Sequence, residues 1–561
     1  MDDPTAPAEP ETPHSSGGDA GAHATVWVVL LLTLPAQVAA MALLAPRDAS
    51  LGSLLDPLPP HRDKGAGLGD LLAGFFRSSS GELRRPLFWA ADAARAIFEP
   101  EPARWVATFL LGLTLASAAW LVLRPGRGRA GWWAAAAAIL PLSVWAVHPL
   151  RIEPVLCASQ LGTLLGTSLL ATAAKRWRQR LSSADLRPAD GWMLAATVTL
   201  AVLADPTLCF APLALWALTR WTLRETSPRP DRTGAPLALA SIPCALALVA
   251  SLACREPGGG APFGPSILAA CSALVRPLRA TLWPFDLHPA YDPPADFPAQ
   301  IAPSLWVDAV SAAAILAACL WGLRRSHGLG FALTAYLSLV AGRILFARDP
   351  VGADADAHAA TLPLFVAAGV GASDAVARAG KLQAPIALGA SVAHGAFLVP
   401  LLPRSREPWA DERTLAAHIQ RIDPSNERAL VALGDSARRA GAPVADLAHW
   451  YGLALASSDW RPLAHARIGG TLLETGDAAG ARRHLERAVE IAPWIAAARF
   501  DLGTLDLREG KFAAARTHLE AACRLDSESP EPWRVLAQAC DALGDATAMK
   551  VAAARAARLR R

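Results

Sequence analysis

Long apolar stretches alternate with short basic clusters over the first 400 residues of the chain. About 20 apolar residues are needed to cross a bilayer as one helix. We therefore expect eleven membrane-spanning helices, near residues 25–44, 105–123, 131–147, 154–174, 191–204, 207–219, 235–254, 305–323, 329–346, 361–373 and 385–402. The first run lacks a preceding basic flank and is long for a signal peptide, so we expect it to be retained.

The orientation follows from the stretch 191–219, which is long for one helix and contains Asp205 and Pro206 near its middle. Proline and an ionisable residue at that point favour two short spans. With this division, five basic clusters fall on one side of the membrane, at 124–129, 175–180, 220–232, 324–325 and 378–381. Because basic loops face the cytoplasm, we expect a cytoplasmic N-terminus and an extracytoplasmic C-terminal region in the plasma or inner membrane.

After Leu402 the chain becomes polar and repetitive. Small residues recur at a 34-residue interval, as Gly469, Gly503 and Ala537 and again as Gly476, Gly510 and Gly544. A helix–turn–helix repeat needs a small residue where its helices cross and a glycine between them, and this period is typical of tetratricopeptide repeats. An earlier copy with Gly434 and Gly441 brings the number to about four, and the basic helix after Ala546 would cap the stack.

The predicted fold is therefore all-α, with three parts. Residues 1–23 are polar and form a disordered tail. Residues 24–402 form a polytopic helical membrane domain, and residues 403–561 form an extracytoplasmic α-solenoid of repeats. The content of 53% hydrophobic and 18% charged residues is too apolar for a soluble protein of this length. The formal net charge of +4 is small, so we expect no nucleic-acid partner.

Sequence motifs for the common enzyme chemistries are missing from the chain, which has no Walker loop, dinucleotide fingerprint, GxSxG or HExxH. The cysteines show no CxxC spacing, so we expect core packing and no metal site. For Cys523 and Cys540 a disulfide and a pair of buried small residues both remain open. Candidate chemistry lies at His148 and Glu153, which close a turn between two predicted spans and place an imidazole beside a carboxylate. A capped, solvated turn is the alternative interpretation.

Four short blocks occur in the order found in one membrane family: Arg85-Pro86-Leu87, His148-Pro149-Leu150-Arg151-Ile152-Glu153-Pro154-Val155, Trp283-Pro284 with Tyr291, and His358 with Leu362-Pro363. Together with the repeats, these blocks resemble the transmembrane and tetratricopeptide repeat-containing O-mannosyltransferase-like family, whose fold is similar to GT-C glycosyltransferases. The resemblance extends over nearly the whole chain. It implies transfer of a sugar from a polyprenyl-phosphate donor to a protein hydroxyl on the extracytoplasmic face, with no further cofactor.

The resemblance also implies roles for individual residues. Asp48 aligns with the first acid of the family's acidic pair and would be the catalytic base, while Ala49 replaces the second acid. Arginines suited to bind the donor phosphate are Arg84, Arg85, Arg276 and Arg279. Residues that would support the site are His148, Glu153, Asp56 and His358.

Two alternatives from other classes stay open. The loss of charge at Ala49 favours a catalytically inactive, membrane-anchored scaffold whose repeats bind a protein partner. A transporter is a weaker alternative, because few ionisable residues interrupt the predicted spans, namely Asp205, Asp308 and Arg343.

Overall fold

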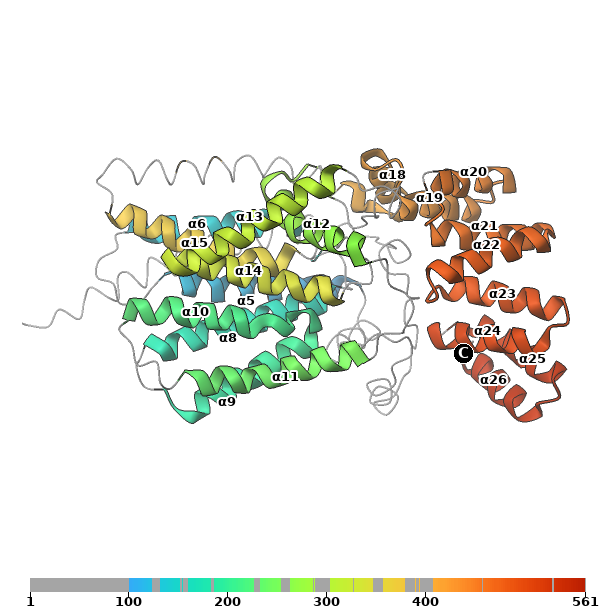
Figure 1. Ribbon diagram of the computed structural model, residues 1–561, viewed down its shortest axis with the longest axis horizontal. Helices are drawn as coiled ribbons and strands as arrows, with labels where there is room; N and C mark the ends of the chain where they lie inside the picture. The colour runs from blue at the N-terminus through green and yellow to red at the C-terminus, as the bar shows by residue number, and fades with distance from the viewer. Residues whose placement is uncertain are drawn as a thin grey trace, which may run out of the picture.

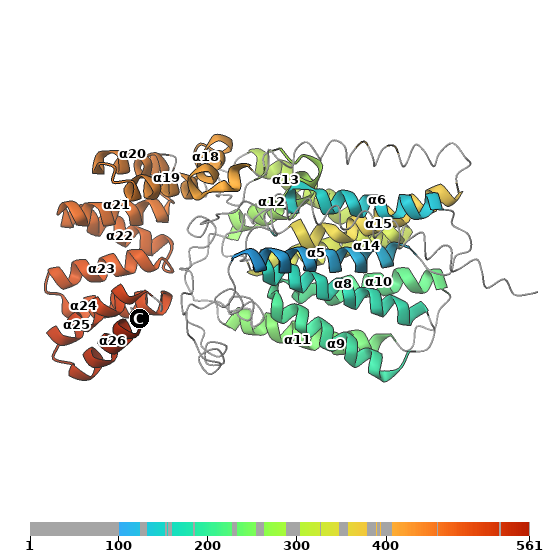
Figure 2. The ribbon, with the colours of Figure 1, turned by 180° about the vertical axis from the view of Figure 1, so that it is seen from behind.

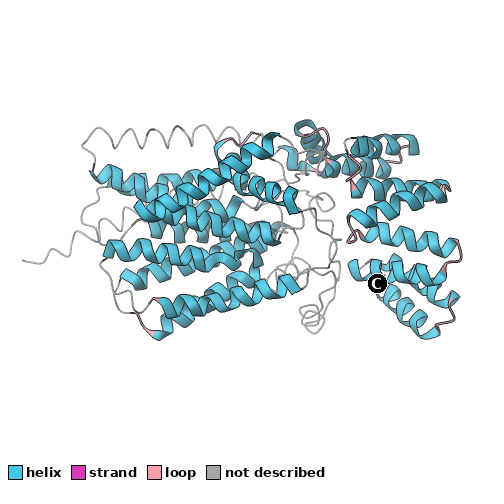
Figure 3. Ribbon diagram, viewed as in Figure 1, coloured by secondary structure: helices cyan, strands magenta, loops and turns pink. Residues whose placement is uncertain are grey.

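The computed structural model describes the chain from the first helix of a bundle to the end of a repeat array. The described residues are 100–123, 132–151, 160–182, 186–226, 233–253, 263–285, 303–325, 327–346, 357–378, 407–456, 458–526 and 529–559, with a few isolated positions. The expected tail 1–23 and the expected spans 25–44 and 385–402 lie outside them. Every regular element in the described part is a helix, which confirms the all-α prediction there (Figure 3).

The N-terminal helices form a bundle in which every span expected between 105 and 373 overlaps a helix. The helices are α5 (Pro100–Val122), α6 (Trp132–Val147), α8 (Leu161–Ser182), α9 (Pro188–Ala204), α10 (Ala211–Thr226), α11 (Gly234–Ala253), α12 (Phe263–Leu282), α13 (Pro303–Arg325), α14 (His327–Phe346) and α15 (Ala357–Arg378). Two short 3-10 helices, η1 (Pro149–Arg151) and η3 (Pro206–Phe210), join α6 to the chain that follows and α9 to α10. The expected break at Asp205 is therefore present.

The expected number of eleven spans is not met by the described helices. Three of them are long and apolar enough to cross a membrane: Pro303–Arg325, Gly328–Leu345 and Ala357–Arg378. Four shorter apolar helices accompany them, at Val106–Val122, Ala137–Val147, Pro188–Ala204 and Gly234–Val249. The prediction overcounted because it credited every apolar run, whereas α9 has only 17 residues and α8 ends in a basic segment.

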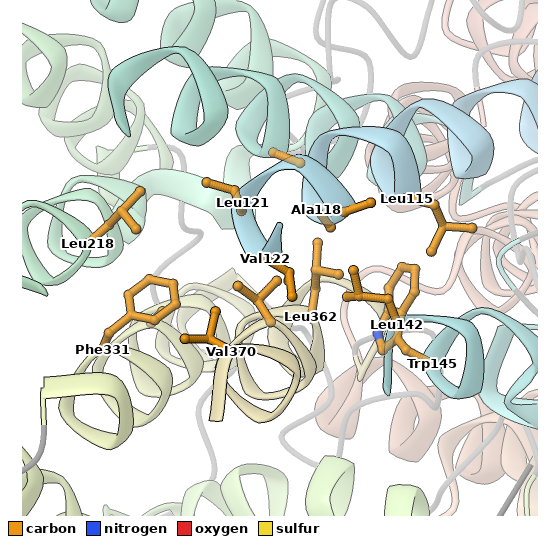
Figure 4. Close-up of a cluster of buried hydrophobic side chains, with 14 of the residues drawn as sticks. Leu115, Ala118, Leu121, Val122, Leu142, Trp145, Leu218, Phe331, Leu362 and Val370 are labelled. Atoms are coloured by element: carbon orange, nitrogen blue, oxygen red, sulfur yellow. The ribbon is translucent and has the colours of Figure 1, made fainter. Parts of the chain in front are cut away.

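The bundle is held together by apolar contacts between helices distant in sequence. Figure 4 shows Val122 of α5, Leu362 and Val370 of α15 and Trp145 of α6 converging in one buried cluster. Close approach of α15 to α6 requires glycine at position 369, because a Cβ there would collide with the carbonyl oxygen of Ala138. Packing of this kind fixes which helix faces point inward.

The outward faces of several bundle helices are apolar. On α13 the exposed large apolar side chains are Trp306, Val307, Val310, Leu316, Leu320 and Trp321. On α11 they are Ile242, Leu246 and Val249. A contiguous apolar surface of this kind is unfavourable in water and suits contact with lipid or another apolar partner.

The C-terminal region is an array of helix pairs. A short 3-10 helix, η6 (Glu407–Ala410), and α18 (Glu412–Ile422) precede four pairs: α19 (Glu427–Arg439) with α20 (Val444–Ala456), α21 (Pro462–Thr475) with α22 (Ala478–Ile491), α23 (Ala496–Arg508) with α24 (Phe512–Leu525), and α25 (Pro530–Ala542) with α26 (Ala546–Leu559). Both ribbon views place this array beyond one end of the bundle (Figures 1 and 2).

The repeated glycines have the two roles expected from the sequence. Gly441, Gly476, Gly510 and Gly544 all have positive φ angles of 75° to 90°, a conformation that other residues rarely adopt, and each follows the first helix of a pair. Gly469 lies where its two helices cross, since a Cβ there would be 2.6 Å from Leu485 Cγ. The prediction of about four helix–turn–helix repeats is confirmed by these pairs.

The first helix of each pair lies on the inner side of the array. Consecutive first helices, α19 with α21, α21 with α23 and α23 with α25, contact one another. The second helices make no comparable contact with each other within the described residues. We call the surface formed by α19, α21, α23 and α25 the inner face.

Candidate functional site

One end of the bundle contains a buried polar cluster assembled from α6, η1 and α15. The Arg151 guanidinium donates from Nη2 to Thr361 Oγ1 at 3.0 Å and from Nε to the Trp145 carbonyl at 3.2 Å. It also lies over the Trp145 ring, 4.4 Å from the ring centroid. The His358 ring stands 5.0 Å from the same tryptophan ring. His148 joins this cluster to α12, because its Nε2 is 3.0 Å from the carbonyl oxygen of Thr281.

The hydrogen-bonding capacity of this cluster is incompletely used. Arg151, His148 and His358 are fully buried. Nη1 of Arg151 and both ring nitrogens of His358 have no hydrogen-bond partner among the described residues. Buried polar groups are normally paired, and a buried guanidinium without a counter-charge is costly.

A second buried polar group, which contains an ion pair, joins α14 to the break between α9 and α10. Arg343 Nη2 donates to Asp205 Oδ2 at 2.8 Å and to Thr163 Oγ1 at 3.2 Å. The other carboxylate oxygen of Asp205 accepts from the hydroxyl and the backbone N–H of Thr207. Asp205 and Arg343 were expected to interrupt separate spans, and the structure brings the two residues together as an ion pair.

The predicted site residues are only partly brought together. His148 and His358, both predicted as supporting residues, lie in the same cluster, with Thr281 of α12 beside His148. Arg279, on the same helix, is directed to Asp308 at 3.7 Å and is more than half exposed. Arg276 also lies on α12. The expected residues Asp48, Asp56, Arg84, Arg85 and Glu153 lie outside the described residues.

Arg151 is the residue at this end of the bundle to which no role was assigned from the sequence. It stands between His148 and Glu153 in the same turn, so proximity alone could have suggested it. Its hydrogen-bond partner Thr361 is 210 positions away, and the sequence does not place the two residues side by side. Within the described residues, no group of three or more His, Cys, Asp or Glu side chains could hold a metal ion.

The inner face of the repeat array carries a network of charged side chains that crosses from one repeat to the next. Asp435 of α19 accepts hydrogen bonds from Nε and Nη2 of Arg467 of α21, the shortest being 2.9 Å to Oδ1 and 2.8 Å to Oδ2, and a further one from the Tyr451 hydroxyl. Arg438 Nη1 of α19 donates to Glu474 of α21 at 2.6 Å. These charged side chains therefore link the first helices of adjacent repeats.

Asp501 of α23 extends this network to the next repeat. A Cβ on Gly470 would lie 2.9 Å from Asp501 Oδ2, so glycine at that position leaves room for the carboxyl group. Burial raises the pKa of Asp501 to about 6, while the charge of Arg467 acts in the opposite direction. The inner face therefore contains a carboxyl group whose pKa is raised above that of an ordinary aspartate.

Comparisons with known proteins support the prediction of tetratricopeptide repeats in the array, and they give no match that identifies the bundle. The sequence model of the tetratricopeptide repeat matches residues 472–539, so the chain contains repeats of this type. No curated protein matches the chain. These findings give no support to the resemblance to O-mannosyltransferase-like proteins.

Similar solved structures include three helical proteins, each with a low overall score. MamA is 16% identical, with 27% of this chain and 81% of that chain covered and a TM-score of 0.23. Yeast Tom70 is 14% identical over 72% of this chain and 88% of its own, with a TM-score of 0.24. The Cut9–Hcn1 tetramer of the APC/C is 12% identical over 84% and 83%, with a TM-score of 0.25. Scores at this level do not establish a common overall fold.

Proposed function

We propose that the chain is a membrane-anchored scaffold whose tetratricopeptide repeats bind a protein partner. Tetratricopeptide repeats generally bind other proteins, and the repeats of this chain form one continuous stack. The apolar outer surface of the bundle, with three helices able to span a bilayer, supports the anchor. In this proposal residues 24–402 are the membrane domain and residues 403–561 the binding domain.

The observation that carries the proposal is the continuity of the inner face. Its side chains come from α19, α21, α23 and α25 in register, so one extended segment of a partner can contact several repeats at once. Gly470, Thr504 and Gln538 occupy the same repeat position at a 34-residue interval. Because Gly470 lies against Asp501 of the next first helix, this position belongs to the inner face.

Photo-crosslinking of the membrane-embedded full-length chain tests this proposal. A photoreactive residue at Thr504 or Gln538, on the inner face, should crosslink to one discrete protein identified by mass spectrometry. Thr517 is the matched control, since it is an exposed threonine on the second helix α24 of the same pair. Equal crosslinking from Thr504 and Thr517 would contradict an inner-face binding site, and no crosslink from either would contradict the scaffold.

The orientation of the chain is part of the same proposal. The basic clusters between the helices favour a cytoplasmic N-terminus and an extracytoplasmic array. A reporter enzyme that folds only outside the cytoplasm, fused after Arg561, should be active. A reporter active only in the cytoplasm should be silent at the same position, and the opposite pair of results would place the array inside.

A second candidate function is the glycosyl transfer implied by the family resemblance, and one observation favours it. The polar cluster at the end of the bundle holds a buried Arg151 that has no counter-charge among the described residues, beside His148 and His358. An anionic group such as the phosphate of a polyprenyl-phosphate sugar would supply the missing counter-charge. Asp48 would be the base, with Arg84, Arg85, Arg276 and Arg279 as further phosphate partners and Glu153 and Asp56 as supporting residues.

Purified protein tests this second function with a polyprenyl-phosphate sugar and a peptide acceptor. Transfer that falls about 10²- to 10⁴-fold in Asp48→Asn, with unchanged folding, would support enzymatic activity. If the wild-type chain shows only the background turnover of Asp48→Asn, the second function is excluded and the scaffold remains.

A further inference from the structure

Two histidines of one repeat face each other across the contact between α21 and α22. His465 Nδ1 lies 2.9 Å from His484 Nδ1, and the ring centroids are 5.1 Å apart. His465 is buried, whereas His484 is half-buried at the edge of the array. A nitrogen–nitrogen distance of this length is that of a hydrogen bond, so one Nδ1 carries a proton and the other accepts it.

The other side of His465 is tied to the segment that joins two repeats. Its Nε2 is 3.2 Å from both the main-chain oxygen and Oδ1 of Asp459, which lies between α20 and α21. Asp459 also accepts a hydrogen bond from Arg487 of α22 at 2.8 Å. The guanidinium of Arg487 lies 5.6 Å from the centroid of the Trp460 ring. The connecting segment and both helices of the following pair therefore meet at the two imidazoles.

The number of protons on the pair decides whether this contact can persist. With two neutral rings, His465 donates from Nε2 to Asp459 and accepts at Nδ1 from His484. With one added proton, one ring is an imidazolium that donates from Nδ1 to the neutral ring, so the contact between the rings persists. A second added proton puts hydrogen on both facing nitrogens, which then repel each other at 2.9 Å. Only the doubly charged pair must separate.

The charged groups around His484 disfavour its protonation. Burial lowers the pKa of His484, and the neighbouring charges of His465 and Arg483 lower it further. Asp459, before α21, and Asp477, at the start of α22, act in the opposite direction. The unfolded chain then takes up a proton at His484 at a higher pH than the folded chain does. The contribution of this contact to the free energy of unfolding is therefore fully present above about pH 6.5, and it decreases as the pH falls below that value.

We propose that His465 and His484 form a proton-sensitive latch at the joint between the α19–α20 and α21–α22 pairs. The latch is closed at neutral pH and opens in mild acid, which frees the connecting segment around Asp459. The state of the two histidines therefore changes how rigidly the α19–α20 pair is held to the following repeats. It does not depend on the identity of the binding partner.

Hydrogen–deuterium exchange of the full-length chain in detergent micelles tests the latch. After correction for the intrinsic rate, backbone amides of 458–466 should exchange faster at about pH 5 than at about pH 7. Between the ordinary histidine pKa of about 6.5 and the lowered pKa of His484, the opening equilibrium should change by about tenfold per pH unit, because opening takes up one proton at His484 in that range. In His484→Asn the amide replaces Nδ1 and does not titrate, so protection should be the same at both pH values.

The chain supplies a matched control at His449, which stands 35 residues before His484 in the corresponding second helix and is exposed. His449→Asn should keep the acid response of the wild type. The proposal is overturned if wild-type exchange at 458–466 does not respond to acid, or if His484→Asn responds as the wild type does.

A second variant keeps the test decisive if His484→Asn folds poorly. Asp459 is two-thirds exposed, so Asp459→Asn should not impair folding. Without the negative charge of Asp459, protonation of His484 is less favourable. The increase in exchange at 458–466 should therefore occur at a lower pH. A transition that stays at the same pH, or that moves to higher pH, would exclude the latch.

Discussion

The bundle and the repeat array place their charged side chains in opposite ways. In the bundle, the ion pair of Asp205 and Arg343 is nearly inaccessible, while large apolar residues such as Trp306 and Trp321 cover the outside. In the array the interior is built of small and apolar residues, and arginine–carboxylate pairs lie on the surface and across repeats. The exposed apolar surface of the bundle suits an apolar environment such as a lipid bilayer, whereas the charged surface of the array suits water.

The comparison also separates two ways in which charges hold a structure together. A buried pair in an apolar environment is costly to break, because the remaining charge has no water to solvate it. An exposed pair is worth little, because water and salt replace the lost partner. Four predictions test this contrast, from the largest expected effect to the smallest.

The largest effect should come from Arg343→Leu in the bundle. This change leaves Asp205 charged, buried and without its arginine, and it should lower the free energy of unfolding by about 3–5 kcal/mol. Thermal unfolding in detergent micelles measures the loss. Adding Asp205→Asn to Arg343→Leu should restore more than half of it, and equal losses in the single and double variants would show that the buried charge is not the cause.

Gly469→Val should cause the second largest loss of stability, and it should affect the unfolding of the array alone. A Cβ at this position would be 2.6 Å from Leu485, so overpacking should cost about 1–3 kcal/mol in the unfolding transition of the array. Gly452→Ala is the control, since it lies in α20 with nothing near its Cβ, and it should stabilise the array by about 0.5–1 kcal/mol. If both changes destabilise equally, crossing-point packing is not the reason.

The third prediction concerns Asp501 on the inner face. Because burial raises its pKa to about 6, the folded chain binds more protons than the unfolded chain between about pH 4 and pH 6. Stability of the array from this group should therefore fall as the pH rises through that window. Asp501→Asn should add about 1–2 kcal/mol at neutral pH, after allowance for partial exposure, and nothing at about pH 4. Denaturant unfolding at the two pH values checks this, and an equal gain at both would contradict it.

The smallest effect should come from Arg534→Gln. Its partner Glu531 lies one turn away on α25, and both side chains are nearly half exposed. Loss of this pair should change the free energy of unfolding by less than about 0.5 kcal/mol. A loss comparable to that of Arg343→Leu, measured in the same denaturation series, would break the contrast between the two regions.

Local features of the chain were predictable. The glycines at 441, 476, 510 and 544 were expected from their spacing, because a helix stop with positive φ is a local requirement that few residues meet. Each span expected between 105 and 373 overlaps a helix of the bundle, but α8 begins at Leu161 where 154 was expected, and α12 was not among the expected spans. The number of spans was not predictable, because apolarity of a run does not give the length of the helix that forms from it.

The candidate sites were harder to predict because they depend on long-range contacts. His148 was singled out from the turn that it closes with Glu153, and His358 from a resemblance of short blocks. Both contact Trp145, because the His148 backbone N–H donates to the Trp145 carbonyl and the His358 ring stands beside the Trp145 ring. Arg151 was quoted in one of these blocks but received no role of its own. The facing pair of His465 and His484 carries no motif, since 19 residues separate them and only the angle between α21 and α22 brings their rings together.

The sequence by itself determined the all-helical class, the 34-residue period and the boundary near Leu402 at which the chain turns polar. These properties are written in local composition and spacing, which do not depend on distant residues. The tertiary structure alone decided which polar side chains meet, as Arg343 meets Asp205 over 138 positions and Arg151 meets Thr361 over 210. The physical reason is that a small rotation of one packed helix changes which side chains face inward, and that rotation is set by the packing of all its neighbours.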